Sequence, residues 1–308
     1  MILTEREGIK MKKYNKSQSY DPEVLEKIHN VHRQIMKDFT EVCEKYGLSC
    51  FAVYGTAIGA VRHGGFIPWD DDVDMAMLRE DYDKFFKVFP KELKEKYNLL
   101  TPERDERYAC TVTHLQRRGT VFISEMSQDL KCEQCIYMDI FPLDYVAEGR
   151  IRQMLQGLTA NFWGKMLFLA GSSKPVITYR GIVGEAMSLI CRCVHHLIRI
   201  FRISPRWFYR RYMKTATKYN HSRKRSEYVT SFEYMGCLKD KIKRKEIFPL
   251  KKVPFEDMEV NLPHNNHEFL SKVYGNYMKL PPKDERVNHM PLVIQFEGEK
   301  PIYKKTGI

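Results

Sequence analysis

Four aspartates fall within five residues of this chain, at Asp70, Asp71, Asp72 and Asp74. Carboxylates at this spacing repel one another, so gathering them in a folded protein is costly unless cations neutralise their charge. Carboxylate oxygens are preferred ligands of Mg²⁺, which proteins usually hold through a few carboxylates together with substrate phosphates. A solvated acidic turn is the alternative, but the run leads into an apolar segment that reads as a buried strand. We therefore expect a divalent-metal site.

Strand periodicity narrows the set of carboxylates. Residues 72–77 are expected to form a strand, in which successive side chains point to opposite faces. Asp72 and Asp74 then share a face and can share one ion or bridge two, whereas Asp71 points elsewhere and is not expected to bind metal. Asp139 lies inside a second apolar strand, expected over residues 136–141, where a carboxylate is expensive to bury unless it is paired or metal-bound.

A second element precedes the acidic run. Residues 48–54 are expected to form a strand and residues 57–62 a short helix, with Gly55 and Thr56 forming the turn between them. A glycine lets a phosphate approach the backbone, and the start of a helix offers N–H groups to it. Thr56 adds a hydroxyl donor, and Arg62 and His63 could hold phosphate oxygens. The alternative for Arg62 and His63 is that they are ordinary surface charges.

The stretch from residue 54 to residue 74 resembles the signature of the LicD family of phosphotransferases, which are related to fukutin and fukutin-related protein. Residues 138–144, 248–250, 274–278 and 281–282 resemble the same family, so the similarity covers roughly residues 25–145 and 225–285. The resemblance implies an α+β fold, with a nucleotidyltransferase-like mixed β-sheet core flanked by helices and an additional helical subdomain.

The resemblance also implies roles for the site residues. Asp139 would take the proton from the acceptor hydroxyl, and Arg62 would support the charge that develops on the leaving phosphate. Asp70 matches a family acid that either binds metal or supports a ligand. The implied assignments are catalytic Asp72, Asp74 and Asp139; metal-binding Asp70, Asp72, Asp74 and Asp139; and phosphate- or nucleotide-binding Gly55, Thr56, Arg62 and His63.

The implied reaction needs Mg²⁺ or Mn²⁺ and a CDP-alcohol donor. The family moves phosphocholine from CDP-choline, and its fukutin relatives use CDP-ribitol. The implied acceptor is a hydroxyl of a cell-surface glycan, such as lipopolysaccharide or teichoic acid, or of its lipid-linked precursor. Two alternatives stay open: transfer of a nucleotidyl group from an NTP, and a non-catalytic protein that binds membranes or polyanions.

Composition favours an anionic partner. The net charge is +12, and the mean hydropathy of −0.47 argues against an integral membrane protein. No apolar leader segment and no uncharged run of membrane-spanning length is visible, so the eight cysteines are expected to be reduced and the protein cytoplasmic. The Cys132/Cys135 pair has zinc-knuckle spacing but no second pair, which favours ordinary thiols over structural zinc.

The chain divides into four expected parts. Residues 1–20 form a flexible basic leader, 21–150 the catalytic core, 151–225 a helical subdomain, and 226–308 a part that completes the catalytic domain. Within the core, Asp21 and Pro22 predict the start of a helix that ends before Gly47. Basic and aromatic residues alternate over 192–225, which predicts peripheral contact with an anionic membrane or merely solvated helix faces. Nucleic acid is not expected.

Overall fold

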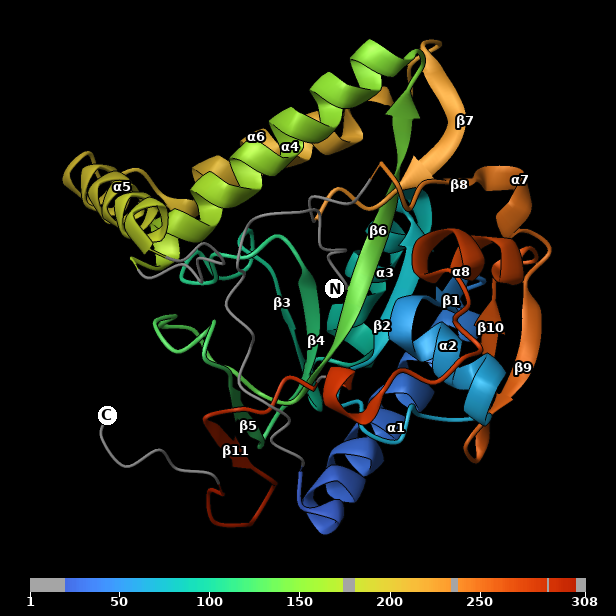
Figure 1. Cartoon of the computed structure of the whole chain (residues 1–308). Helices are drawn as coiled ribbons and strands as arrows, with labels where there is room; N and C mark the ends of the chain where they lie inside the picture. Colours follow the sequence, from blue (N-terminus) through green and yellow to red (C-terminus); the bar gives the residue numbers. More distant parts are fainter. Residues whose placement is uncertain (1–19, 174–180, 234–237, 287, 303–308) are drawn as a thin grey trace.

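A computed structural model of the chain describes residues 20–173, 181–233, 238–286 and 288–302 (Figure 1). The leader expected over residues 1–20 lies outside these ranges except for Tyr20, which is buried. The division of the chain into four parts stays a prediction.

The described residues form helices and strands in a mixed order. The helices are α1 (Pro22–Lys45), α2 (Tyr54–His63), α3 (Arg79–Glu92), α4 (Arg150–Gly171), α5 (Gly181–Ile200), α6 (Pro205–Ala216), α7 (Arg244–Ile247) and α8 (Asn266–Tyr274), with 3₁₀ turns η1 (Thr217–Tyr219) and η2 (Lys283–Glu285). The strands are β1 (Cys50–Ala52), β2 (Asp74–Leu78), β3 (Tyr97–Leu100), β4 (Thr113–Arg117), β5 (Val121–Ile123), β6 (Tyr137–Ala147), β7 (Arg225–Thr230), β8 (Ile242–Lys243), β9 (Lys251–Phe255), β10 (Met258–Leu262) and β11 (Val293–Gln295).

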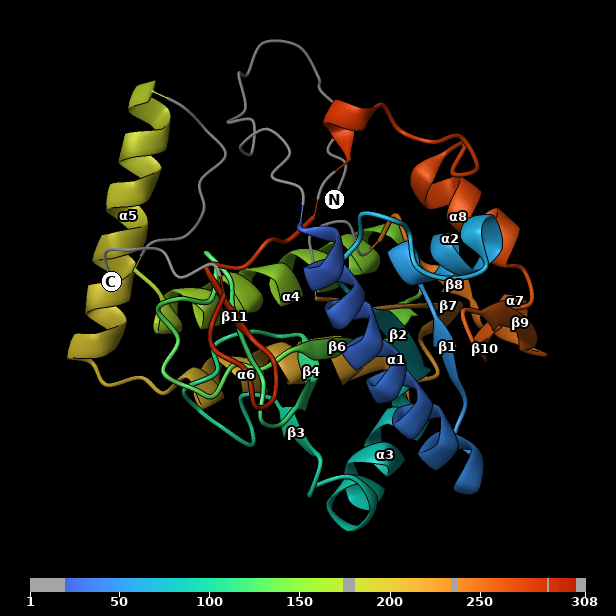
Figure 2. The same ribbon diagram turned by 90° about the horizontal axis from the view of Figure 1, so that it is seen from below.

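The centre of the fold is a mixed sheet with the strand order β1-β2-β6-β4-β3, and β7 and β8 extend it from β6. Strand β6 is long because its first half pairs with β2 and β4 and its second half with β7. Strand β2 runs parallel to β6, whereas the other pairings in this sheet are antiparallel. With helices against it (Figures 1 and 2), the sheet makes this an α+β protein, as predicted.

The two faces of the sheet are covered by different helices. Ala76 of β2 and Phe141 of β6 point toward Phe269 of α8, and α2 lies on the same side. Alternation sends Met75 and Met77 to the opposite face, where α1 and α3 pack on the sheet. Asp74 and Asp139 share the parity of Ala76 and Phe141, so they belong to the face of α2 and α8.

The boundaries of α1 confirm the predicted helix. The Asp21 side chain accepts a hydrogen bond from the Glu23 N–H at 2.9 Å, and Pro22 occupies the first helical position. The helix ends at Lys45, and Gly47 follows with a φ of 63°, a conformation that glycine adopts without strain. Its apolar face, including Ile28, Ile35 and Phe39, is buried against the sheet.

Two predicted boundaries are wrong near the acidic run. The turn expected at Gly55 and Thr56 is instead the first turn of α2, which begins at Tyr54. The expected strand over 72–77 begins only at Asp74, so Asp72 lies in the loop before it. In both places, hydrogen bonds between distant segments decide where the element begins.

Within the stretch 151–225, the described residues form helices α4, α5 and α6 followed by the turn η1. Helices α4 and α6 pack along each other, and α5 lies beyond them at one end of the molecule (Figures 1 and 2). By length and mean hydropathy, α5 alone among the described helices could cross a membrane. The search for an uncharged run missed this helix because Glu185, Arg192 and Arg199 interrupt its sequence.

A buried ion pair connects α3 to β6. The guanidinium of Arg79 donates to both carboxylate oxygens of Asp144 at 2.8 and 2.6 Å, and Asn220 donates to the same carboxylate at 2.7 Å. Both charged side chains are buried, with 8% and 1% of their surface exposed. Removing one partner of such a pair leaves an uncompensated charge in the core.

We expect Arg79→Met to lower the free energy of unfolding by about 3–5 kcal/mol, because Asp144 loses its counter-ion. Urea unfolding followed by circular dichroism measures this loss. The control is Lys84→Met, which breaks an exposed pair with Asp81 and should cost about 1 kcal/mol or less. Equal losses of unfolding free energy in the two variants would contradict the conclusion that Arg79 and Asp144 form a buried, stabilising ion pair.

Candidate active site

The parallel pairing of β2 and β6 brings the distant aspartates together. Asp74 lies opposite Asp139 in the register of the two strands. The ladder extends one step further, since the Asp139 N–H donates to the Val73 carbonyl at 2.8 Å. Asp74 and Asp139, which the sequence places in two separate strands, are therefore neighbours at one end of the sheet.

The start of α2 lies directly against this pair. The Thr56 hydroxyl accepts a hydrogen bond from the Asp74 N–H at 2.8 Å, which links the first turn of α2 to the first residue of β2. A Cβ atom added to Gly55 would lie 2.9 Å from Oδ2 of Asp70. Gly55 is therefore needed for this close approach, and the two motifs expected from the sequence meet at one site.

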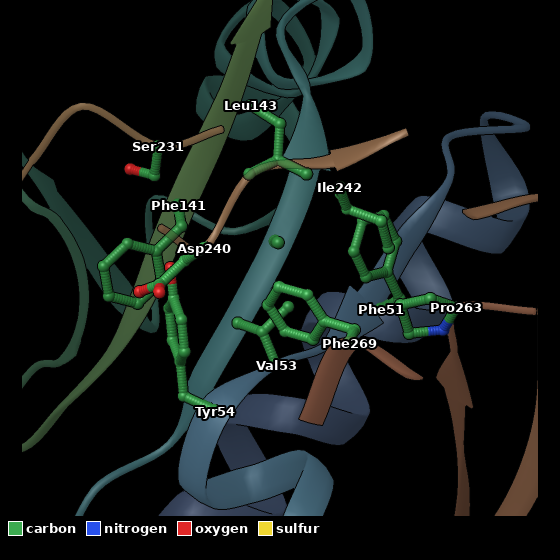
Figure 3. A pocket seen from close by; sticks show the side chains of 11 residues that line it. Phe51, Val53, Tyr54, Phe141, Leu143, Ser231, Asp240, Ile242, Pro263 and Phe269 are labelled. Carbon is green, nitrogen blue, oxygen red and sulfur yellow. The ribbon is translucent and has the colours of Figure 1, made fainter. Parts of the chain in front are cut away.

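Tyr54 holds the start of α2 in place. Its φ of 49° is unusual for a residue with a side chain. Figure 3 shows its ring in an apolar pocket between the sheet and α8, with Phe141 and Phe269 nearby. The ring centroids of these two residues lie 5.3 and 6.3 Å from that of Tyr54. This aromatic packing stabilises the backbone conformation that positions Gly55 and Thr56.

Asp71 has partners of its own. Its carboxylate accepts hydrogen bonds from the Tyr20 hydroxyl at 2.5 Å and from the His289 backbone N–H at 2.8 Å. Although burial opposes ionisation, the bonds from His289 and Tyr20 hold the pKa of Asp71 below its ordinary value. Asp71 is thus an ionised group bound to protein, which agrees with its expected absence from the metal ligands.

His289 also reaches the next aspartate. Its Nδ1 lies 3.4 Å from Oδ1 of Asp71 and 3.3 Å from Oδ2 of Asp72. The hydrogen bond to Asp71 and the charges of Asp72, Asp71 and Asp70 raise the pKa of His289 to about 9. The ring is therefore a cation at neutral pH, and it offsets part of the negative charge of the loop.

The remaining carboxylates are strongly perturbed. Burial raises the pKa of Asp70 well above its ordinary value, and the charges of Asp72, Asp71 and Asp74 raise it further. The pKa of Asp74 is raised likewise, mainly by burial and then by the charges of Asp72 and Asp139. The pKa of Asp139 is raised by burial and then by Asp72, and burial also raises the pKa of Asp72. A cation at this position would relieve the repulsion.

Asp139 also shows an unsatisfied atom. Its Oδ1 is buried and makes no hydrogen bond, although Nε2 of His114 lies 3.2 Å away. Burial lowers the pKa of His114 to about 3, so this ring is neutral at pH 7. The ring stacks on Tyr137 with centroids 3.8 Å apart, which holds it beside the carboxylate.

These carboxylates fit a divalent cation. Within the residues that the structure describes, no three side chains of His, Cys, Asp or Glu already converge as a metal cage. Mg²⁺ does not require one, because it usually keeps several waters and takes one or two carboxylates plus substrate phosphates. The buried free oxygen of Asp139 and the mutual repulsion of Asp70, Asp72 and Asp74 are what such a cation would correct.

Two arginines flank Trp69 beside the aspartates. The guanidinium carbon of Arg62 lies 6.0 Å from the Trp69 ring centroid, and that of Arg286 lies 4.3 Å from it. Arg62 donates to the Tyr277 carbonyl at 2.7 Å and to Nε2 of His63 at 2.9 Å. Burial and the charge of Arg286 lower the pKa of Arg62. Two like charges are thus held close together next to Asp70, as an anion-binding pair would be.

His63 lies next to Arg62 at the end of α2. Burial and the charge of Arg62 lower its pKa, so the ring is neutral and accepts a hydrogen bond from Arg62. It supports that arginine, and its role toward phosphate stays a prediction. All the other residues assigned from the sequence, Gly55, Thr56, Arg62, Asp70, Asp72, Asp74 and Asp139, gather at this end of the sheet.

Sequence reasoning missed His289, Arg286, His114 and Tyr20. The two C-terminal residues lie in a polar segment without periodicity, and nothing local marks them as partners of residues some 220 positions earlier. His114 lies in β4, where the alternation of side chains places it on the same face as its register partner Asp139. Cys132 and Cys135 are buried, and burial raises the pKa of both thiols.

Replacing Asp74 by Asn removes one repelling charge while keeping the side-chain shape. With EDTA present, we expect Asp74→Asn to melt at a higher temperature than the unmodified protein. A carboxyl group whose pKa is raised on folding destabilises the fold as the pH rises, so the difference should be wider at about pH 8 than at about pH 5. Differential scanning fluorimetry measures both.

Mg²⁺ should make the unmodified protein melt at a higher temperature than Asp74→Asn. The ion binds the folded unmodified site and so raises the melting temperature of that protein by mass action. The variant should gain little. Asp257→Asn, in the exposed turn between β9 and β10, is the matched control and should behave as the unmodified protein. Equal stabilisation of Asp74→Asn by Mg²⁺ would exclude this residue from the metal site.

Comparison with known proteins agrees with this geometry. Residues 47–156 match the family model described as LicD/FKTN/FKRP, nucleotidyltransferase domain, a range that contains Gly55, the aspartate run and Asp139. The lipopolysaccharide cholinephosphotransferase LicD of Haemophilus influenzae is 27% identical over 260 residues, which are 83% of this chain and 91% of that protein.

Two further relatives are shorter matches. An uncharacterised protein of Rickettsia typhi is 41% identical over 58 residues, 19% of each protein. Another, of Rickettsia prowazekii, is 27% identical over 127 residues, which are 38% of this chain and 47% of that protein. The family model covers the site and the cholinephosphotransferase aligns with most of the length, so the part of the chain that holds the site, residues 47–156, is a LicD-family domain.

Proposed function

We propose that this protein is a metal-dependent phosphotransferase that moves phosphocholine from CDP-choline onto a hydroxyl of a cell-surface glycan, a teichoic acid or a lipid-linked precursor. The observation that carries the proposal is the partly buried carboxylate cluster, in which Asp74 meets Asp139 across two parallel strands, with Asp72 in the loop before β2 and Gly55 nearby. The similarity to a lipopolysaccharide cholinephosphotransferase supports the donor and the acceptor.

The proposed cation is Mg²⁺ or Mn²⁺, held by Asp72, Asp74 and Asp139 with Asp70 beside them. When bound, it would supply positive charge against the diphosphate of the donor and the departing CMP. The nucleotidyltransferase-like fold belongs to the same proposal, which the description of the matching family model supports.

The protein's own groups then account for binding. The first turn of α2 presents backbone N–H groups, and Gly55 in that turn lets the Asp70 carboxylate approach the helix backbone closely. Arg62 and Arg286, both held next to Trp69, would bind the phosphate oxygens and support the charge on the leaving CMP. The hydrogen bond from Asp74 N–H to Thr56 keeps α2 and the carboxylates in fixed register.

The transfer step exchanges one phosphorus–oxygen bond for another. The acceptor hydroxyl oxygen forms a bond to the choline-bearing phosphorus, while the bond from that phosphorus to the oxygen of CMP breaks. Asp139 takes the hydroxyl proton, since its buried Oδ1 makes no hydrogen bond and its pKa is raised. CMP leaves with the electron pair of the broken bond, so no oxidant or reductant is required.

Incubation of the purified protein with CDP-choline, Mg²⁺ and a glycan acceptor should release CMP and label the acceptor with choline phosphate. Asp72→Asn, Asp74→Asn and Asp139→Asn should each lower the rate at least about a hundredfold, because charge stabilisation is the main catalytic term. Asp257→Asn serves as control. Pyrophosphate released from CTP as the only product would instead establish nucleotidyl transfer. Full rates in all three variants would show that these aspartates do not catalyse the reaction.

The arginine pair gives a separate prediction. Arg62→Lys and Arg286→Lys should each raise the KM for CDP-choline about tenfold, because lysine cannot reproduce the planar contact with Trp69 and phosphate. The control is Arg104→Lys. Arg104 also lies over aromatic rings, but these belong to Phe86 and Phe89 of α3. Steady-state kinetics at several donor concentrations distinguish the variants, and an unchanged KM in both would remove the pair from the donor site.

A further inference from the structure

Helix α5 exposes an unusual amount of apolar surface. Ile182 is 86% exposed, Ile200 71% and the following Phe201 70%, and Leu189, Ile190 and Leu197 are each more than half exposed. Only 17% of the most apolar part of this helix is buried in the molecule. Scattered exposed apolar residues are ordinary, but a contiguous set on one element marks an interaction surface.

The exposed apolar residues lie on one face of α5. At 3.6 residues per turn, Ile182, Leu189, Ile190, Leu197 and Ile200 form a single stripe. A second face is buried on α4 and contains Gly184, His195 and Ile198; the His195 Nδ1 lies 2.7 Å from the Leu169 carbonyl. A third face carries Arg192, His196 and Arg199, all exposed. Helix α5 thus has an apolar stripe away from the protein and a basic flank.

Helix α4 adds a second stripe of the same kind. Ile151, Leu155, Leu158 and Phe162 are each more than half exposed and recur at helical spacing. The opposite face of α4, with Ala160 and Leu167, is buried with α6. We call the exposed apolar residues of these two helices and their flanking bases the α4–α5 surface.

The charges of the α4–α5 surface are predominantly positive. Helix α4 contains Arg150, Arg152 and Lys165 but no acidic residue, and α5 contains a single acid, Glu185, against two arginines. A helix with an apolar stripe and a basic flank is the arrangement of helices that lie in a lipid–water interface. A protein partner would require no such excess of bases, whereas anionic lipid headgroups attract them.

Helix α4 connects this surface to the candidate active site. A Cβ on Gly171 of α4 would meet Ala109 at 2.3 Å, and one on Gly164 would meet Thr111, so the inner face of α4 packs directly on the segment before β4. In that segment, the Tyr108 ring lies 5.2 Å from that of His114, whose Nε2 is 3.2 Å from Asp139. A lipid surface against the outer face of α4 would therefore be separated from Asp139 by α4 itself, by the segment before β4 and by His114.

We propose that the α4–α5 surface binds peripherally to an anionic lipid bilayer, with α5 lying in the plane of the headgroups. The helix lies on the membrane instead of crossing it, because one face is packed on α4 and two arginines occur within its length. Of the stretch 192–225 expected to contact a membrane, α6 buries Phe208, Tyr209 and Tyr212, so the exposed apolar side chains lie mainly at the end of α5 and at Phe201. Membrane binding needs no turnover, so it stands or falls independently of the transferase reaction.

Co-sedimentation of the full chain with vesicles tests the proposal. The protein should bind phosphatidylcholine vesicles that contain about one-third phosphatidylglycerol, bind pure phosphatidylcholine weakly, and be released by high salt, since basic residues near the surface contribute a screened attraction. Arg192→Gln with Arg199→Gln should weaken binding about twentyfold, at roughly fivefold for each base. Lys252→Gln, an exposed base on β9, is the matched control and should bind as the unmodified protein.

The apolar stripe is tested by a quadruple change, Ile182→Gln, Leu189→Gln, Leu197→Gln and Ile200→Gln. It should weaken vesicle binding more than about a hundredfold, because several side chains no longer enter the interface. Val61→Gln, at an exposed apolar position of α2, is the control and should have no effect. Far-UV circular dichroism and release of CMP from CDP-choline report whether the quadruple variant remains folded.

Four results would overturn the proposal. One is equal binding of the quadruple variant and the unmodified protein, and another is no preference for anionic over neutral vesicles. The third is self-association, in which size-exclusion chromatography shows a dimer that the quadruple variant abolishes, because a second copy would then cover the stripe. A protein that alkaline carbonate cannot release from membranes would show that α5 crosses the bilayer, which also contradicts peripheral binding.

Discussion

The parallel pairing of β2 with β6 is the constraint on which the site depends. This pairing sets Asp74 opposite Asp139, although 64 other residues separate them in the chain. A shift of one residue would turn Asp139 to the opposite face of the sheet, where α1 and α3 pack. The register is protected because Met75, Met77 and Ile140 are buried and would exchange places with charged groups. The core thus specifies the geometry of the carboxylates.

The site opposes the stability of the fold that holds it. Asp70, Asp74 and Asp139 have raised pKa values because they are buried near one another, which means that each ionised carboxylate destabilises the native state. The ring of His289 lies next to the carboxylates of Asp71 and Asp72, and its positive charge offsets part of this negative charge. The large apolar cluster around the sheet supplies the stability that allows the arrangement to persist. A site that strains the fold in this way is expected where function needs unpaired charge.

Much of the site could be predicted from local sequence, and the reasons are specific. The aspartates, Gly55 and Arg62 lie within one short stretch, so spacing and family resemblance both apply to them. Asp139 stood out because a carboxylate within an apolar strand is rare. Alternation failed for Asp72 because the strand begins two residues later, where the Thr56 hydroxyl holds the Asp74 N–H. His289 and Arg286 could not be predicted, since only tertiary packing brings them to the aspartates.

The helical region shows a different limit of sequence reasoning. In α6, the spacing of Phe208, Tyr209 and Tyr212 describes one face, and that face enters the core. In α5, both the buried face and the outer stripe are apolar, so periodicity cannot tell which of them contacts α4. The small Gly184 and the hydrogen bond from His195 to the Leu169 carbonyl decide the matter, because they permit and anchor close packing of the two helices. The larger apolar side chains are then left on the outside, where burying them requires an apolar phase that the described residues do not provide.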